Sequence, residues 1–188
     1  MKFSSWLVVG LIAASAQAAV AADKFVLKSA DIAPNAKIAD KHVFKGFGCE
    51  GGNLSPALEW SGAPAGTRSF AVTVYDPDAP TGSGWWHWVV FNIPASTTKL
   101  DQGVGDASGA RLPAGAVQSR TDYGGPGYGG PCPPKGPSLK KPHRYIFTVF
   151  ALKVDKLDLG PDSSGALVGY MLNANALGKA TFTGRYGR

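Results

Sequence analysis

Residues 86–93 read WHWVVFNI, a run in which apolar side chains stand at both odd and even positions. A strand with one face in water alternates apolar and polar residues, so this run is typical of a strand covered on both faces. Residues 144–152 (RYIFTVFAL) have the same character, and residues 69–75 (SFAVTVY) combine β-branched and aromatic side chains before Asp76-Pro77. These three runs predict the central strands of a sheet.

Weaker patterns surround these runs. We expect short strands at residues 25–27, 42–47 and 57–60, and a closing edge strand at residues 181–186. One helix is predicted near the C-terminus, where residues 162–164 (DSS) supply caps and apolar residues recur at helical spacing. The recurring residues are Leu167, Tyr170, Met171, Ala174 and Leu177.

The composition indicates a mainly β protein. The 188 residues include 25 Gly and 14 Pro, too many for a helical bundle because both residues interrupt helices. An apolar fraction of 44% excludes a disordered chain, and the glycines have no period of three, which excludes collagen. We therefore predict an all-β fold, an antiparallel β-sandwich with one C-terminal helix and short helical turns, as a single domain at residues 23–188.

The first 22 residues have the layout of a secretory signal peptide. Lys2 precedes a short apolar run, and small residues follow it up to Ala22. A membrane anchor is the alternative, but the apolar run is short and no stop-transfer charges follow it. We expect cleavage after Ala22, with Ala18 and Ala21 as alternative sites, and therefore a periplasmic or secreted protein.

The chain has two cysteines, Cys49 and Cys132. An exported protein with two cysteines has one intramolecular pairing, so we predict a disulfide between them; two buried free thiols are the alternative. There is no C-x-x-C pair, so the sequence supports neither a zinc ribbon nor a thioredoxin-like site.

Common catalytic signatures are absent from the sequence. It contains no G-x-S-x-G, no H-E-x-x-H and no Walker A motif. G-x-G-x-x-G occurs at residues 46–51 and 125–130, but prolines follow both matches at short distance, so neither opens a helix as a dinucleotide site requires. We predict no cofactor.

Polar side chains stand at the ends of the predicted strands. Asp76 and Asp78 follow the first strand, His87 lies in the second, and His143 opens the third. Each has a structural alternative, an Asx-turn for the aspartates and a core position for each histidine. A Gly/Pro-rich loop at residues 124–137 is also long enough to be functional. If these strand ends converge, they form a small polar pocket beside aromatic rings.

The sequence resembles the phosphatidylethanolamine-binding protein (PEBP) family, which includes Raf kinase inhibitor protein. The similar segments are residues 76–80 (DPDAP), 86–92 (WHWVVFN), 133–136 (PPKG) and 143–145 (HRY). Residues 46–53 (GFGCEGGN), 81–86 (TGSGWW) and 164–170 (SGALVGY) are closer to the bacterial YbhB/YbcL branch. The leader and the two cysteines are similar to its periplasmic YbcL-like type.

The resemblance implies a β-sandwich with a surface pocket for phosphate-like anions, including the phosphoethanolamine head group of a lipid. Carried over by motif, the ligand-binding residues are Asp76, Asp78, His87, Gly130, Pro131, Pro133, His143 and Tyr145, with Trp86 and Arg144 as additional candidates. The chain departs from the family at residues 137–142, a longer spacer that adds Lys140 and Lys141 near the pocket mouth.

The residue types fit an anion that also carries an ammonium. His87 and His143 can donate from their rings, and both charge near pH 6 to 7 when unperturbed. A carboxylate near a phosphate repels it, so we expect an imidazolium to neutralise one aspartate while the other binds the ligand's ammonium. The sequence thus predicts a non-catalytic protein that binds phosphate or phosphoethanolamine-like ligands.

Three other interpretations stay open. The protein could be an interaction module, such as a protease, kinase-pathway or host-protein inhibitor acting through an outer surface. The two His and two Asp would also suit a metal site or the acid and base of a hydrolase, although no metal-spacing motif is present. The net charge of +6 is spread along the chain, so nucleic acid is not expected, and membrane contact through Lys135, Lys140, Lys141 and Arg144 would be peripheral at most.

Overall fold

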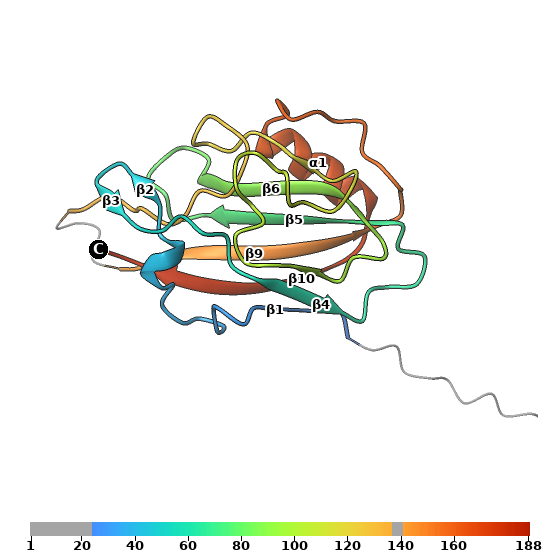
Figure 1. Ribbon diagram of the computed structural model, residues 1–188, viewed down its shortest axis with the longest axis horizontal. Helices are drawn as coiled ribbons and strands as arrows, with labels where there is room; N and C mark the ends of the chain where they lie inside the picture. Colours follow the sequence, from blue (N-terminus) through green and yellow to red (C-terminus); the bar gives the residue numbers. More distant parts are fainter. Residues whose placement is uncertain (1–23, 137–140) are drawn as a thin grey trace, which may run out of the picture.

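Five antiparallel strands form the largest sheet of the computed structural model, which describes residues 24–136 and 141–188 (Figure 1). Their order is β10–β9–β5–β6–β8. The bounds are Ser69–Asp76 for β5, Trp85–Pro94 for β6, Val117–Gln118 for β8, His143–Leu152 for β9 and Ala176–Tyr186 for β10. The three runs predicted as central strands are β5, β6 and β9, and the predicted closing strand is part of β10 at the sheet edge. The predicted leader at residues 1–22 lies outside the described residues.

A second, three-stranded sheet covers one face of the large sheet. It contains β1 (Val26–Lys28), β4 (Leu58–Ser61) and β7 (Lys99–Leu100) in the order β1–β4–β7. Trp60 of this sheet lies in one buried cluster with Val72, Trp88 and Phe147 of the large sheet. The expected antiparallel sandwich is therefore confirmed, and its main core lies between these two sheets.

Helix α1 (Gly165–Asn175) covers the opposite face of the large sheet (Figure 1). Ala71 and Val89 of the sheet pack with Val168 and Leu172 of the helix in a second buried cluster. The predicted cap is also present, because the Ser164 side chain accepts a hydrogen bond from the backbone N–H of Leu167. The two clusters explain why the central strands are apolar at odd and even positions alike.

The helix buries a different face from the one that its apolar spacing indicated. Leu167 and Tyr170 of the predicted stripe are exposed, Leu177 belongs to β10, and the buried positions are Gly165, Val168 and Leu172. The reason is close packing at Gly165, where an added Cβ would lie 2.4 Å from Cγ of Trp86. Only glycine lets the helix approach that ring, so this contact sets the rotation of the helix.

The strand expected at residues 42–47 was wrong. A 3-10 helix, η1, occupies Asp40–His42, and only Lys45–Gly46 form a strand, β2, which pairs with β3 (Cys49–Glu50) in a short hairpin. The buried His42 ring bonds through Nδ1 to the carbonyl of Leu54 at 2.7 Å. This bond to a residue 12 positions further along the chain holds the segment in a turn, so the sheet pairing is shortened.

The predicted disulfide joins Cys49 and Cys132. It ties β3 to the Gly/Pro-rich loop, two segments 83 residues apart in the chain. Within residues 24–136 and 141–188, no helix is long and apolar enough to span a membrane.

Candidate functional site

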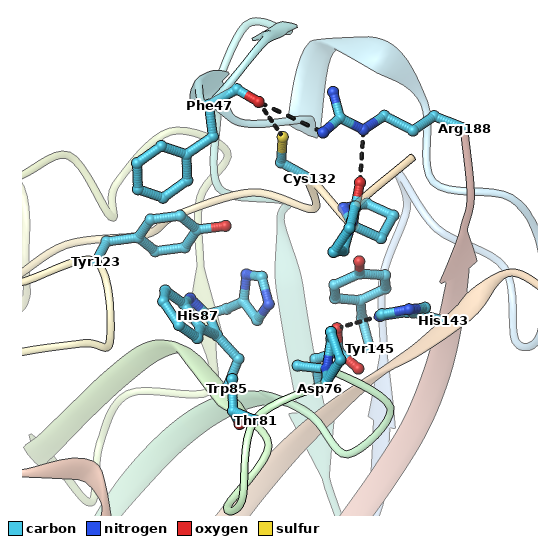
Figure 2. A pocket seen from close by; sticks show the side chains of 14 residues that line it. Phe47, Asp76, Thr81, Trp85, His87, Tyr123, Cys132, His143, Tyr145 and Arg188 are labelled. Carbon is cyan, nitrogen blue, oxygen red and sulfur yellow. Dashed lines mark hydrogen bonds and ion pairs between the residues drawn. The ribbon is translucent and has the colours of Figure 1, made fainter. Parts of the chain in front are cut away.

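A cavity of about 300 Å³ opens at one end of the main core, where strands β5, β6 and β9 meet (Figure 2). Asp76, the last residue of β5, pairs with Trp85 at the start of β6, and β9 begins beside them at His143. The antiparallel register therefore brings the polar strand ends together, as the sequence predicted. Five of the predicted residues line this cavity: Asp76, His87, Pro133, His143 and Tyr145.

His143 and Asp76 form a buried pair in the cavity wall. Nδ1 of His143 lies 2.8 Å from Oδ2 of Asp76, and both side chains are about 5% exposed or less. Because an ionised carboxylate only accepts hydrogen bonds, His143 donates from Nδ1 and its Nε2 remains for the cavity. Oδ1 of Asp76 accepts from the backbone N–H of Asp78 at 2.8 Å. The predicted pairing of one aspartate with a histidine therefore has a defined geometry.

His87 behaves differently from the sequence expectation that both rings charge near neutrality. Its Nδ1 lies 2.7 Å from the carbonyl oxygen of Gly129, which can only accept, so Nδ1 carries the hydrogen. Burial lowers the pKa of His87 to about 4, against the opposing effect of Gly129 and nearby carboxylates. The ring is therefore neutral at pH 7, and its Nε2 is a hydrogen-bond acceptor.

Two aromatic residues that line the cavity each carry an enclosed hydrogen-bond donor. The hydroxyl of Tyr145 and the indole N–H of Trp85 are enclosed and have no hydrogen-bond partner among the described residues. Burial raises the pKa of Tyr145 above its ordinary value, so the phenol keeps its proton. A buried donor without a partner costs free energy, which a ligand that accepts both bonds would recover.

Arg188 lies over the cavity mouth and links its two rims (Figure 2). Its Nε donates to the carbonyl of Pro133 at 2.5 Å, and Nη1 donates to the carbonyl of Gly48 at 2.9 Å. These partners are neutral, and no described carboxylate forms an ion pair with Arg188. The guanidinium therefore keeps its positive charge available at the opening.

Asp78 and Arg144 lie outside the cavity, contrary to expectation. The Arg144 guanidinium donates to both oxygens of Asp78, at 2.7 and 2.9 Å, and holds the pKa of that carboxyl below its ordinary value. Since Arg144 already occupies the Asp78 carboxylate, Asp78 does not supply the free carboxylate that was expected to bind an ammonium. The pair instead joins the β5 end to the start of β9.

Gly130 and Pro131 support the cavity from behind without lining it. The N–H of Gly130 donates to Oδ1 of Asn53 at 2.8 Å, and its carbonyl accepts from the Tyr123 hydroxyl at 2.8 Å. The carbonyl of Pro131 accepts from the N–H of Phe44. These bonds fix the loop that carries Cys132 and Pro133 into the cavity wall.

Gly130→Ala is expected to destabilise the protein by about 1 to 3 kcal/mol. An added Cβ would lie 2.0 Å from the carbonyl oxygen of His42 and 2.6 Å from the backbone N of Phe44, and backbone atoms cannot move aside as a side chain can. Gly125→Ala is the matched control, because nothing lies within 4 Å of its added Cβ. Urea unfolding of both variants measures the difference; equal midpoints would contradict the packing argument.

Trp86 lies on the helix-facing side of the sheet, so it is not a cavity residue. A β-bulge explains this placement, because Val74 pairs with Trp88 while the next residue, Tyr75, pairs with Trp86. The extra residue, His87, is left between them, and bulges commonly redirect a side chain in this way. Trp85, two residues before His87, shares its side of the strand and lines the cavity instead. Two-residue periodicity counted from His87 would have identified Trp85.

Several cavity residues were missed in the sequence. Phe47, Tyr123 and Arg188 reach the cavity from a hairpin tip, a loop and the end of the chain, where no periodic pattern exists. Cys132 was predicted as a disulfide partner but not as a cavity residue. Lys140 falls outside the described residues, and Lys141 is exposed without lining the cavity. Across the described part of the chain, no cluster of three His, Cys, Asp or Glu side chains is arranged to hold a metal ion.

Comparison with known proteins identifies the family. The sequence model for phosphatidylethanolamine-binding proteins matches residues 28–187. The chain belongs to this family. PEBP-family relatives include the UPF0098 protein YbcL of Escherichia coli K12, which is 57% identical over 179 residues, 95% of this chain and 94% of YbcL. YbhB of the same organism is 50% identical over 160 residues, 85% of this chain and 98% of YbhB.

Solved structures agree with this assignment. The crystal structure of E. coli YbcL, described as a new member of the mammalian PEBP family, matches with a TM-score of 0.85 over 88% of this chain and 99% of that one. A PEBP homologue from Chlamydia trachomatis, CT736, is 27% identical and matches with a TM-score of 0.70 over 87% of this chain and 97% of that one. The resemblance noted in the sequence, including its YbhB/YbcL branch, is therefore confirmed.

Proposed function

We propose that this protein binds small phosphorylated ligands, such as phosphate or the phosphoethanolamine head group, in the cavity, without catalysing a reaction. The observation that carries the proposal is the pair of enclosed donors, the Tyr145 hydroxyl and the Trp85 indole N–H, which have no partner among the described residues. The family model, named for phosphatidylethanolamine binding, supports a ligand of this class.

The charges around the cavity favour an anion over a cation. Arg188 offers an uncancelled positive charge at the mouth, and Asp76 is already hydrogen-bonded by His143 and by the Asp78 backbone. Buried polar groups interact more strongly than exposed ones, so a phosphate that reaches Tyr145 gains from each donor. The volume of about 300 Å³ is at the lower end of small-molecule sites and suits a head group better than a whole lipid.

The side chains in the cavity support a binding role. The two residues in its lining that could act as Ser/Thr/Cys-type nucleophiles are both engaged: Thr81 donates its hydroxyl to the carbonyl of Gly84 at 2.6 Å, and Cys132 is in the disulfide. Neither oxygen nor sulfur is hydrogen-bonded to a histidine that could activate it. Covalent catalysis by a side-chain nucleophile therefore has less support than binding.

We also infer that the protein is exported to the periplasm or secreted. The leader-like residues 1–22 support this, and the disulfide agrees with it, since disulfides persist in oxidising compartments. Peripheral contact with an anionic lipid surface is compatible with the positive net charge of +6.

The binding proposal is tested by an amide NMR titration of residues 23–188, oxidised, with phosphoethanolamine and with inorganic phosphate. Saturable shifts are expected around Asp76, His87 and His143. Arg188→Gln should weaken binding about tenfold, the loss of one hydrogen bond to a charged group. Lys179→Gln, which removes one exposed positive charge far from the cavity, should leave the affinity unchanged. An absence of shifts at millimolar ligand would exclude this cavity as an anion site and favour a macromolecular partner.

A further inference from the structure

His87 presents a neutral hydrogen-bond acceptor to a cavity whose lining also includes the donors Tyr145 and Trp85. We propose that Nε2 of His87 selects phosphate groups that carry a proton: it accepts a hydrogen bond from a P–OH group, and so favours phosphate and phosphomonoesters over sulfate. This inference rests on the proposed anion-binding function and adds a specificity to it.

Two reciprocal hydrogen bonds fix the ring. Nδ1 of His87 donates to the carbonyl of Gly129 at 2.7 Å, and the N–H of Gly129 donates to the carbonyl of His87 at 2.8 Å. Because Nδ1 is committed to a carbonyl, Nε2 at the far end of the ring is the atom left for a ligand. Figure 2 shows the ring projecting into the cavity between Tyr123 and Tyr145. Both tyrosines meet it edge-on, at centroid distances of 5.5 and 5.0 Å, which restricts its rotation.

The groups that face His87 do not convert it to a donor. Asp76 and Asp122 favour its charged form, but burial has the larger effect and lowers the pKa. Tyr123 and Tyr145 are neutral, because burial raises the pKa of both phenols. Two further charged or titratable groups lie near the cavity. His143 is bonded to Asp76, and the positive charge of Arg188 at the mouth disfavours a positive charge on the His87 ring. Nε2 therefore keeps its lone pair at pH 7.

A fully deprotonated anion places its own lone pairs against that of Nε2. Phosphomonoesters can avoid the repulsion, because their second pKa is about 6 and a proton is readily retained on one oxygen. Inorganic phosphate retains its second proton up to a somewhat higher pH, so it avoids the repulsion in the same way. Sulfate carries no such proton near neutral pH. The carboxylate of Asp76 is a second acceptor in the same cavity, so the contribution of His87 has to be separated from it by substitution.

The proton makes binding depend on pH. Between about pH 4 and 6 the free monoester already carries the proton and His87 is neutral, so affinity should change little. Above the second pKa of the ligand, the complex must take up one proton from solvent, and affinity should fall about tenfold for each further pH unit. Sulfate affinity should show no such fall.

The test is calorimetric titration of the oxidised protein, residues 23–188, with inorganic phosphate and with sulfate. At pH 7 we expect phosphate to bind at least tenfold more tightly than sulfate. At pH 8, titrations in two buffers of different ionisation enthalpy should give an uptake of about one proton with phosphate. Equal affinity for the two anions, or no proton uptake, would overturn the inference while leaving anion binding in place. No binding of either anion would instead overturn the proposed function.

Two variants assign the selectivity to His87. The His87→Gln variant places a side-chain amide near the Nε2 position, and this amide can turn its NH₂ group to the cavity. The ratio of phosphate affinity to sulfate affinity should then fall below about threefold, and proton uptake should disappear. Asn in His87→Asn can still donate to Gly129 but does not reach as far, so it removes the acceptor without adding a donor; it too should lose the uptake. If both variants keep the ratio and the uptake, Asp76 or His143 holds the proton and the inference is wrong.

Discussion

Replacing Cys49 and Cys132 together by alanine is expected to lower the free energy of unfolding by roughly 3 to 5 kcal/mol. The disulfide closes a loop of 83 residues, and opening it restores most of the conformational freedom of that loop to the unfolded chain. Native proteins have unfolding free energies of about 5 to 15 kcal/mol, so this loss is a large share of the total stability. Urea unfolding of the oxidised wild type and the double variant measures it.

Wild-type protein treated with a thiol reductant is the control for that experiment. It should unfold at the same urea concentration as the double variant, because both lack the same link. The double variant should also bind phosphate more weakly, since Cys132 lines the cavity and its loop is held there by Cys49. An unchanged unfolding midpoint would show that the hydrogen bonds of Gly130 and Pro131 suffice to hold this loop.

Asp76→Ala is expected to cost about 3 to 5 kcal/mol, because it leaves His143 buried without its partner. The pair is almost fully enclosed, and the backbone N–H of Asp78 also loses its acceptor. Asp76→Asn keeps the shape and one acceptor oxygen, so its cost should be smaller. Thermal or urea unfolding at pH 7 ranks the two variants.

Asp158→Ala serves as the matched control for Asp76, since this carboxylate is exposed and forms no ion pair with the described residues. Its effect should stay within about 0.5 kcal/mol. The double variant Asp76→Ala/His143→Ala should lose less unfolding free energy than the two single variants lose together, because removing both partners leaves neither side chain buried without its partner. Strict additivity would mean that the two side chains do not interact.

Much of the fold could be predicted from the apolar residue pattern within each individual strand. The runs that became β5, β6 and β9 were visible because burial on both faces places apolar residues at odd and even positions alike. The rotation of α1 was not visible, because its spacing of apolar residues did not reveal the tight contact between Gly165 and Trp86. The strand predicted at residues 42–47 was wrong for a related reason. The conformation of this segment is set by the hydrogen bond between the buried His42 ring and the carbonyl of Leu54 rather than by local propensity.

The candidate site was predictable only in part. The convergence of Asp76, His87 and His143 followed from polar groups at strand ends, and the family resemblance added Tyr145 and Pro133. The bulge at His87 could not be anticipated, because it depends on how β6 pairs with β5. Trp85 could have been identified from two-residue periodicity, because His87 was already a predicted cavity residue. Arg188 and Phe47 come from segments whose positions depend on the whole fold. The acceptor character of His87 likewise depends on one carbonyl, that of Gly129.

The contact between Trp86 and Gly165 has a consequence for how this protein can diverge. The two positions share one volume, since the indole ring occupies the space where a side chain at residue 165 would begin. A mutation that enlarges residue 165 is tolerated only after residue 86 has become smaller, so the order of the two changes is constrained. We therefore expect substitutions at the two positions to be coupled among related sequences, with the residue at one position limiting which residues can follow at the other.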